Sequence, residues 1–225
     1  MDNEQFSRTI GLIGIDEYLY LKEKTILIAG IGGVGGTTFE ALLRMGFEHF
    51  ILIDKDVVSL SNLNRQVLYK KDNIGKLKVE VAREFALSVN ENADIKIYPN
   101  YVQEVISEFT PDIIVDAIDD IEGKIALIKH ANEKNIPIIV STGMANKMDP
   151  SKITIGSLNK SSVDPLAKKL RYELKRREID FSSIDCVYST ETPFKDGAKL
   201  NSIITVTSTA GLFLAYYVFS FLKRR

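Results

Sequence analysis

The residues best suited to chemistry begin with a glycine-rich turn, Gly30-Ile31-Gly32-Gly33-Val34-Gly35. The turn separates an apolar run at 25–29 from apolar residues at helical spacing over 34–45. A strand, a tight turn and a helix N-terminus in this order favour phosphate binding, because free backbone N–H groups and the positive end of the helix dipole meet there. We therefore predict that Gly30, Gly32, Gly33 and Gly35 contribute to a nucleotide site.

A carboxylate lies where such sites bind ribose. The next apolar run, 50–53, ends on Asp54, about 20 residues beyond Gly35. An NAD-dependent oxidoreductase would share both features, so they leave the kind of nucleotide open. No lysine follows Gly35, so the turn is not a P-loop, and the cations for a triphosphate must come from other segments.

Candidate phosphate ligands follow in the polar segment after Asp54. Arg65 offers a planar fork to phosphate oxygens, and Lys76 or Lys78 offers a point charge. Asn62 can both donate and accept hydrogen bonds. The alternative for Lys78 is a solvated lysine on a helix face.

Asp119 is the candidate metal ligand. It lies just past the apolar run 113–115, at the edge where doubly wound sheets bind ligands. A carboxylate there suits Mg²⁺, which takes few protein ligands and prefers phosphate oxygens for the rest. Capping the next helix is the alternative role for Asp119, whereas Asp116 is expected to be structural.

The elements that would position these residues alternate along the first two thirds of the chain. Strand patterns occur at 25–29, 50–53, 95–98, 113–115 and 138–140. Helix patterns lie between them, at 34–45, 76–89, 102–109 and 121–133. Uninterrupted apolar strands joined by helices predict an α/β fold with a doubly wound, mainly parallel, Rossmann-like sheet.

The pattern changes beyond Gly143. It predicts an edge strand at 152–155, a charged helix at 165–177 and a short strand at 186–189. We expect a single domain, 1–225, with an ATP-binding core at 1–145 and a C-terminal elaboration at 146–225 that serves the substrate or a dimer. An almost wholly apolar terminal helix at 203–222 is expected to be buried or at an interface, with membrane association as the alternative.

Composition narrows the class of protein. The formal net charge is -1, so any polyanion would have to bind a local basic patch. Cys186 is the single cysteine, which excludes a cysteine-based zinc site within one chain. Cys186 is expected to be a core residue, with a thiol acceptor as the alternative. The polar N-terminus lacks a secretory pattern, and we expect a cytoplasmic protein.

Together these motifs resemble the ThiF/MoeB/HesA adenylating enzymes, the bacterial relatives of ubiquitin-activating enzymes. The resemblance covers about 6–143 and rests on the glycine turn, 54–66 with its Asn-Leu-Asn-Arg-Gln element, 75–78 and 116–119. It implies binding of ATP and Mg²⁺, and attack of a carboxylate on the α-phosphate. It also implies a homodimer and these roles: ribose binding by Asp54, phosphate contacts by Asn62 and Arg65, charge neutralisation by Lys78, Mg²⁺ binding by Asp119, and an arginine, Arg8, that reaches ATP in the partner subunit.

The last third resembles one subgroup, the tRNA threonylcarbamoyladenosine dehydratases, through 148–150, 164–171 and 185–191. This resemblance implies adenylation of the threonine carboxylate of the modified nucleoside, then ring closure with net loss of water. A basic run at 168–177 could contact RNA phosphates or be a solvated helix face. The runner-up function is adenylation of a small ubiquitin-like sulfur-carrier protein, and an inactive scaffold is the last alternative. A sulfur-transfer partner, the choice of tRNA and a need for a monovalent cation stay open.

Overall fold

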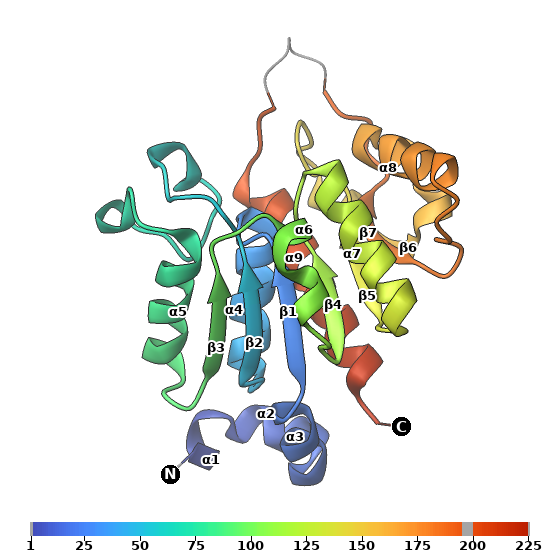
Figure 1. Ribbon diagram of the computed structural model, residues 1–225. Helices are drawn as coiled ribbons and strands as arrows, with labels where there is room; N and C mark the ends of the chain where they lie inside the picture. Colours follow the sequence, from blue (N-terminus) through green and yellow to red (C-terminus); the bar gives the residue numbers. More distant parts are fainter. Residues whose placement is uncertain (1, 195–199, 225) are drawn as a thin grey trace.

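The computed structural model describes residues 2–194 and 200–224, and its strands form one seven-stranded sheet (Figure 1). The strand order is β3-β2-β1-β4-β5-β7-β6. The strands are β1 Thr25–Ala29, β2 His49–Ile53, β3 Asp94–Tyr98, β4 Ile113–Asp116, β5 Ile138–Ser141, β6 Ile153–Ser157 and β7 Asp185–Ser189. All neighbours pair in parallel except β6, which runs antiparallel to β7 at the edge. The doubly wound α/β prediction is confirmed, including the edge strand.

Helices cover both faces of the sheet and enclose two apolar cores (Figure 1). One face carries α4 Gly33–Met45, α5 Lys78–Val89 and α9 Ile204–Leu222, and the other carries α6 Val102–Val105, α7 Ile121–Lys134 and α8 Pro165–Arg176. Three short helices, α1 Asp2–Gln5, α2 Ser7–Ile13 and α3 Ile15–Lys22, lie below the amino ends of the strands. The carboxyl ends of the parallel strands therefore meet at the opposite, upper edge of the sheet.

Two predicted helices differ from their expected bounds. The helix expected from residue 76 begins at Lys78, because the Lys76 carbonyl accepts a hydrogen bond from Val58 N (2.9 Å) and Leu77 forms a β-bridge with Val57. The helix expected at 102–109 is α only to Val105 and then tightens into a 3₁₀ turn.

The C-terminal helix α9 packs closely on α4. A side chain at Gly211 would place its Cβ 2.6 Å from the Val34 carbonyl oxygen, so only glycine allows this approach. The opposite face of α9 is open at Leu212 and Tyr216, each more than half exposed, and Phe221 is more than half exposed near the C-terminal end of the helix. Among the described helices, α9 alone has the length and apolar composition to cross a bilayer. Its buried face is that of a core helix, as predicted.

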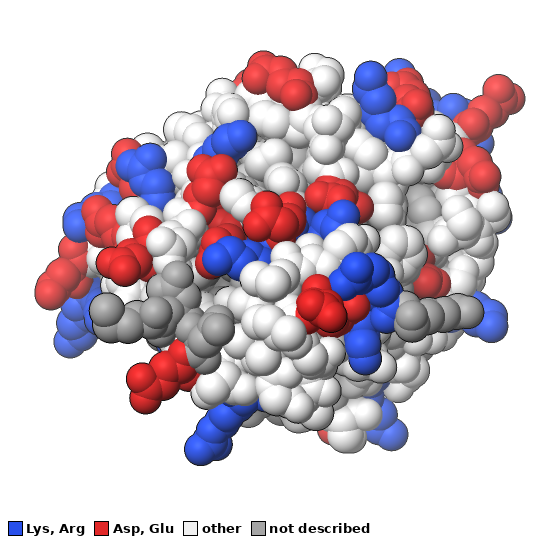
Figure 2. All heavy atoms as spheres, turned by 90° about the horizontal axis from the view of Figure 1, so that it is seen from below, with Lys and Arg blue, Asp and Glu red and all other residues white. Residues whose placement is uncertain are grey.

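Figure 2, seen from the side of the N-terminal helices, shows charges of both signs around an uncharged lower centre.

The C-terminal elaboration joins the same sheet through β7 and β6. Asp164 caps α8 by accepting a hydrogen bond from Ala167 N (2.8 Å), and Pro165 occupies the first helical position. The elaboration thereby places the start of α8 at the carboxyl edge of the sheet, beside the end of β5.

Candidate active site

A cleft of about 1,080 Å³ lies at the carboxyl ends of β1 and β4, where the strand order reverses. Gly30 has φ +86°, and a Cβ there would lie 2.8 Å from the Ala117 carbonyl oxygen, so the turn requires glycine. Gly32 and Gly33 line the cleft. Gly35 does not: a Cβ there would lie 1.8 Å from the Gly30 carbonyl oxygen, so this glycine lets the helix pack under the turn. The structure gives Gly35 a role in packing, and its role in nucleotide binding stays a prediction.

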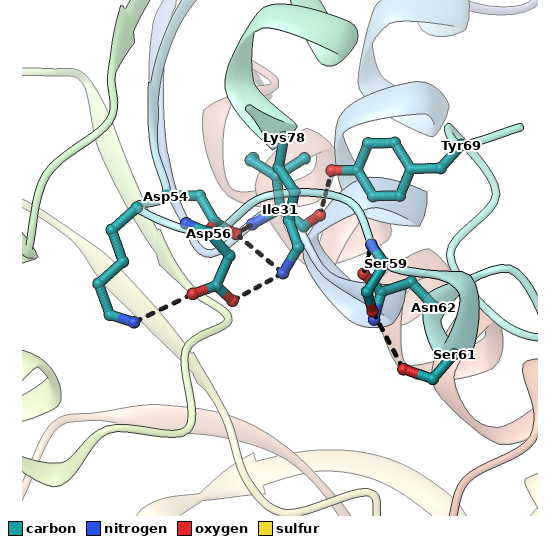
Figure 3. A network of polar contacts seen from close by, with 9 residues as sticks. Ile31, Asp54, Asp56, Ser59, Ser61, Asn62, Tyr69 and Lys78 are labelled. Atoms are coloured by element: carbon teal, nitrogen blue, oxygen red, sulfur yellow. Dashed lines mark hydrogen bonds and ion pairs between the residues drawn. The ribbon is translucent and has the colours of Figure 1, made fainter. Parts of the chain in front are cut away.

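Asp54 joins the strand β2 to the glycine turn (Figure 3). Its Oδ2 accepts a hydrogen bond from Ile31 N (2.7 Å) and its Oδ1 accepts one from Asp56 N (2.9 Å). Each carboxylate oxygen keeps a lone pair, which ribose hydroxyls can use. Burial raises the pKa of Asp54, and the positive charge of Lys78 opposes that rise.

Lys78 is the buried cation of the cleft. Its Nζ lies 2.8 Å from Asp56 Oδ2 and 3.9 Å from Asp54 Oδ2, and its side chain is 7% exposed (Figure 3). Partial burial acts to raise the pKa of Asp56, but hydrogen bonds from Lys78 and Lys55 outweigh it and leave that pKa lowered. Lys76, the other candidate, is exposed and faces Glu84 at 3.7 Å, outside the cleft. Of the two candidate lysines, Lys78 therefore lines the cleft, and its contact with phosphate stays a prediction.

Asn62 and Arg65 form the next part of the lining. The Asn62 amide oxygen accepts a hydrogen bond from Ser59 N (3.0 Å), which leaves its amide N–H groups available (Figure 3). Arg65 Nη1 donates to the Ser61 carbonyl and to Asn64 Oδ1, both at 2.9 Å. Its remaining N–H donors are available to phosphate. This segment is a short 3₁₀ turn, Leu60–Asn62, with its capping box closed by Ser59 and Asn62.

Tyr69 is a residue that sequence reasoning missed. Its buried hydroxyl donates a hydrogen bond of 2.6 Å to the Ile31 carbonyl and so fixes the glycine turn (Figure 3). Burial raises the pKa of Tyr69 well above its usual value, so the hydroxyl stays protonated. No motif signalled this role, since the contact spans 38 residues of sequence.

Asp119 lies on the cleft just beyond β4 and is exposed. Within residues 2–194 and 200–224 its carboxylate has neither a hydrogen bond nor an ion pair. Capping of α7 is done by Asp120, whose Oδ2 accepts from Gly123 N at 2.7 Å, so the alternative capping role for Asp119 is wrong. The described residues contain no group of three or more metal-ligating side chains. A single carboxylate is the donor set that suits Mg²⁺ arriving with phosphate ligands.

Two fully buried ion pairs stiffen the wall of the cleft. Lys124 Nζ lies 2.9 Å from Asp116 Oδ1 and 2.8 Å from the Ser141 carbonyl oxygen. Lys147 Nζ lies 3.0 Å from Asp164 Oδ2, with both side chains at most 2% exposed. The structural role expected for Asp116 is confirmed, whereas neither lysine was predicted. No motif marked either lysine, because its burial depends on packing against other segments of the chain.

Of two further predicted features, one lies away from the cleft and the other is partly neutralised. Arg8 is exposed on α2, below the amino ends of the strands and at the far end from the cleft. Of the basic run on α8, Arg171 binds the Leu158 carbonyl at 3.1 Å, and Arg177 pairs with Glu122 and Glu173. Lys169, in contrast, lines the cleft.

Cys186 is a core residue. Its side chain is fully buried in β7, and burial raises the pKa of the thiol to about 12. A thiolate is therefore not available for chemistry in the folded protein. The core role expected for Cys186 is confirmed.

A second hollow, of about 240 Å³, lies between α1 and the end of α5. Its lining, at 5–6 and 87–92, contains no lysine or arginine, so it lacks the cations that a nucleotide requires.

The family model described as the ThiF family matches residues 6–223. The chain belongs to the ThiF family. It is 34% identical over 193 residues to a tRNA threonylcarbamoyladenosine dehydratase of Bacillus subtilis. The aligned region covers 84% of this chain and 76% of that protein. It is also similar to the crystal structure of Escherichia coli tRNA N6-threonylcarbamoyladenosine dehydratase, TcdA, in complex with ATP, with a TM-score of 0.92 and 30% identity over 98% of this chain and 94% of that chain. SUMO-activating enzyme subunit 2 of Dictyostelium discoideum is 31% identical over only 62% of this chain and 22% of its own length.

Proposed function

We propose that this ThiF-family protein is an ATP-dependent dehydratase that acts on threonylcarbamoyladenosine in tRNA. The observation that carries the proposal is the continuity of one cleft from the nucleotide residues to the C-terminal elaboration. Gly30, Asp54 and Lys78 line it on one side, and Gly143 and Lys169 line it on the other. The likeness to the dehydratases includes both walls, whereas the match to a carrier-protein activator covers a smaller share of the chain.

The proposed chemistry has two steps that balance without an enzyme nucleophile. The threonine carboxylate attacks the α-phosphorus of ATP, which forms an acyl-adenylate and releases pyrophosphate. A nitrogen of the same threonylcarbamoyl group then attacks the acyl carbon, closes a ring, loses its proton and releases AMP. The nucleoside thereby loses one water. Ring closure within one molecule has a high effective molarity, so the buried Cys186 is not needed.

The charges of the cleft suit the first step. Lys78, Arg65, Asn62 and Asp54 all line the cleft. In this proposal the first three contact the phosphates and Asp54 binds the ribose. Mg²⁺ would be held by Asp119 together with phosphate oxygens, which reduces the negative charge that the attacking carboxylate meets.

We further propose a homodimer. Exposed apolar side chains on α9 and on the N-terminal helices support it: Leu212, Tyr216, Phe221, Leu12 and Leu19. Arg8 lies on these N-terminal helices and is too remote from its own cleft to act there, so in this proposal it serves the cleft of the partner.

Nucleoside mass spectrometry of tRNA treated with the protein and ATP tests the proposed function. We expect threonylcarbamoyladenosine to lose the mass of one water, with AMP and pyrophosphate as products. Arg65→Ala and Asp119→Ala should each abolish the mass change. An unchanged nucleoside, together with ATP–pyrophosphate exchange stimulated by a small ubiquitin-like carrier protein, would instead establish adenylation of the carrier.

A further inference from the structure

Buried oxygen atoms without a hydrogen-bond partner gather around the cleft. In the part of the chain that the structure describes, these are Gln66 Oε1, Asp116 Oδ2 and Thr142 Oγ1. Gln66 and Thr142 line the cleft, and Asp116 directly precedes Ala117, which also lines it. Buried polar side chains in folded proteins are almost always hydrogen-bonded. Of the three residues, Gln66 and Thr142 line the cleft, so a bound molecule is one source of the missing partners there.

Two of these atoms belong to features already assigned. Gln66 follows Arg65, and its amide nitrogen lies 3.9 Å from the position of a Cβ on Gly32, on the nucleotide side of the cleft. Asp116 uses its other oxygen in the buried pair with Lys124. Thr142 has no such assignment.

Thr142 lies on the opposite wall, immediately after β5, and is 5% exposed. Its backbone is fixed on both sides. Thr142 N donates to the Val187 carbonyl (3.0 Å), and the next amide, Gly143 N, donates to Asp164 Oδ1 (3.1 Å). Lys147 Nζ donates to the Gly143 carbonyl (2.6 Å) and pairs with Asp164. The backbone of Thr142 is therefore held at the wall of the cleft by a rigid segment, as that of a preorganised binding residue would be.

The chemistry of a hydroxyl limits what it can bind. It is uncharged, so it adds a hydrogen bond and direction but no charge. The polyphosphate already has charged partners across the cleft in Lys78 and Arg65. A hydroxyl on the far wall instead suits the polar oxygens of the second substrate, which must lie between the nucleotide and the elaboration.

We infer that Thr142 Oγ1 donates a hydrogen bond to an oxygen of the threonylcarbamoyl group and holds the acyl end of that group toward the α-phosphate of ATP. This inference rests on the proposed function and assigns Thr142 as a substrate-binding residue on the second wall. The ligand class is an amino acid joined to a nucleoside through a urea.

Thr142→Val tests the inference, because it removes the hydroxyl and keeps the shape of the side chain. We expect the KM for tRNA carrying threonylcarbamoyladenosine to rise about tenfold, the effect of one lost hydrogen bond, with the KM for ATP unchanged. The thermal midpoint of the ligand-free variant should not fall, since no protein hydrogen bond is broken. Thr142→Ser should retain most of the substrate affinity.

Thr38→Val is the matched control. The Thr38 hydroxyl is fully buried and lies 3.1 Å from both the Val34 and the Gly211 carbonyl oxygens, away from the cleft. This variant should lower the thermal midpoint and leave the KM for tRNA unchanged.

Three results would overturn the inference. A Thr142→Val variant that loses thermal stability as Thr38→Val does, with an unchanged KM, would show that water or protein satisfies the hydroxyl. A rise in the KM for ATP alone would assign Thr142 to the nucleotide. If the wild-type protein removes no water from the tRNA nucleoside, the proposed function fails and the inference fails with it.

Discussion

Removing the charge of Lys78 should destabilise the fold as well as the site. Lys78→Met leaves Asp54, whose side chain is 8% exposed, as a buried carboxylate without a cation. Breaking a buried ion pair costs about 3–5 kcal/mol. Here Asp56, the nearer partner, is 49% exposed, and Asp54 keeps two backbone N–H donors, so we expect a loss of about 2 kcal/mol in the free energy of unfolding.

The loss should depend on pH in a defined direction. Burial already raises the pKa of folded Asp54 above its unfolded value of 3.8, and removing Lys78 removes the main opposing effect. Between these pKa values the folded chain binds more protons than the unfolded chain, so stability rises as the pH falls through that window. The deficit of the variant should therefore be larger at about pH 7.5 than at about pH 5.

Urea unfolding followed by far-ultraviolet circular dichroism at both pH values measures this effect. Lys76→Met is the control, because Lys76 is exposed and faces Glu84 at 3.7 Å, an arrangement worth little to stability. An equal deficit at the two pH values, or a deficit no larger than that of the control, would refute the electrostatic account of Asp54.

Three further predictions concern the surroundings of the cleft. Lys169→Ala should weaken tRNA binding and reduce the slope of log affinity against log salt by about 0.7. Lys168 does not line the cleft, so Lys168→Ala should change neither quantity. Equal effects of the two variants in a filter-binding titration would place the RNA elsewhere. Cys186→Ala should keep wild-type turnover. Because the pKa of the thiol is raised to about 12, iodoacetamide should label Cys186 of the wild-type protein only after unfolding. Labelling of the native protein would contradict the burial of Cys186. Mixing the inactive variants Arg8→Ala and Arg65→Ala should restore about a quarter of wild-type turnover, since half of the mixed population consists of heterodimers with one complete site; no recovery would exclude action across a dimer.

The fold could be predicted because its signals are local. Strands buried on both faces give uninterrupted apolar runs, and the helices α4, α7 and α8 each begin at a glycine, proline or aspartate that fits the first turn. Asp164 and Pro165, for example, specify the start of α8 by themselves. The sequence could not define the faces of α9, because all sides of that helix are apolar and only the close approach of Gly211 to α4 distinguishes them.

The nucleotide side of the site was equally accessible from the sequence, since its residues lie in short motifs. The opposite wall was not. There, the buried Lys147–Asp164 pair joins residues 17 positions apart. On the nucleotide side too, one contact lay outside any motif: that of Tyr69 with Ile31, which spans 38 positions. Whether a lysine is buried, or a hydroxyl such as that of Thr142 lacks a partner, depends on the packing of remote segments. These properties require the three-dimensional structure.

The central claim is that the carboxylate of the modified nucleoside attacks the α-phosphorus of ATP in the cleft beside Gly30 and Asp54. Labelling that carboxylate with oxygen-18 tests it directly, because AMP would leave with one carboxylate oxygen when the ring closes. We predict that mass spectrometry finds oxygen-18 in AMP and none in pyrophosphate. Label in inorganic phosphate, with ADP as the nucleotide product, would contradict adenylation.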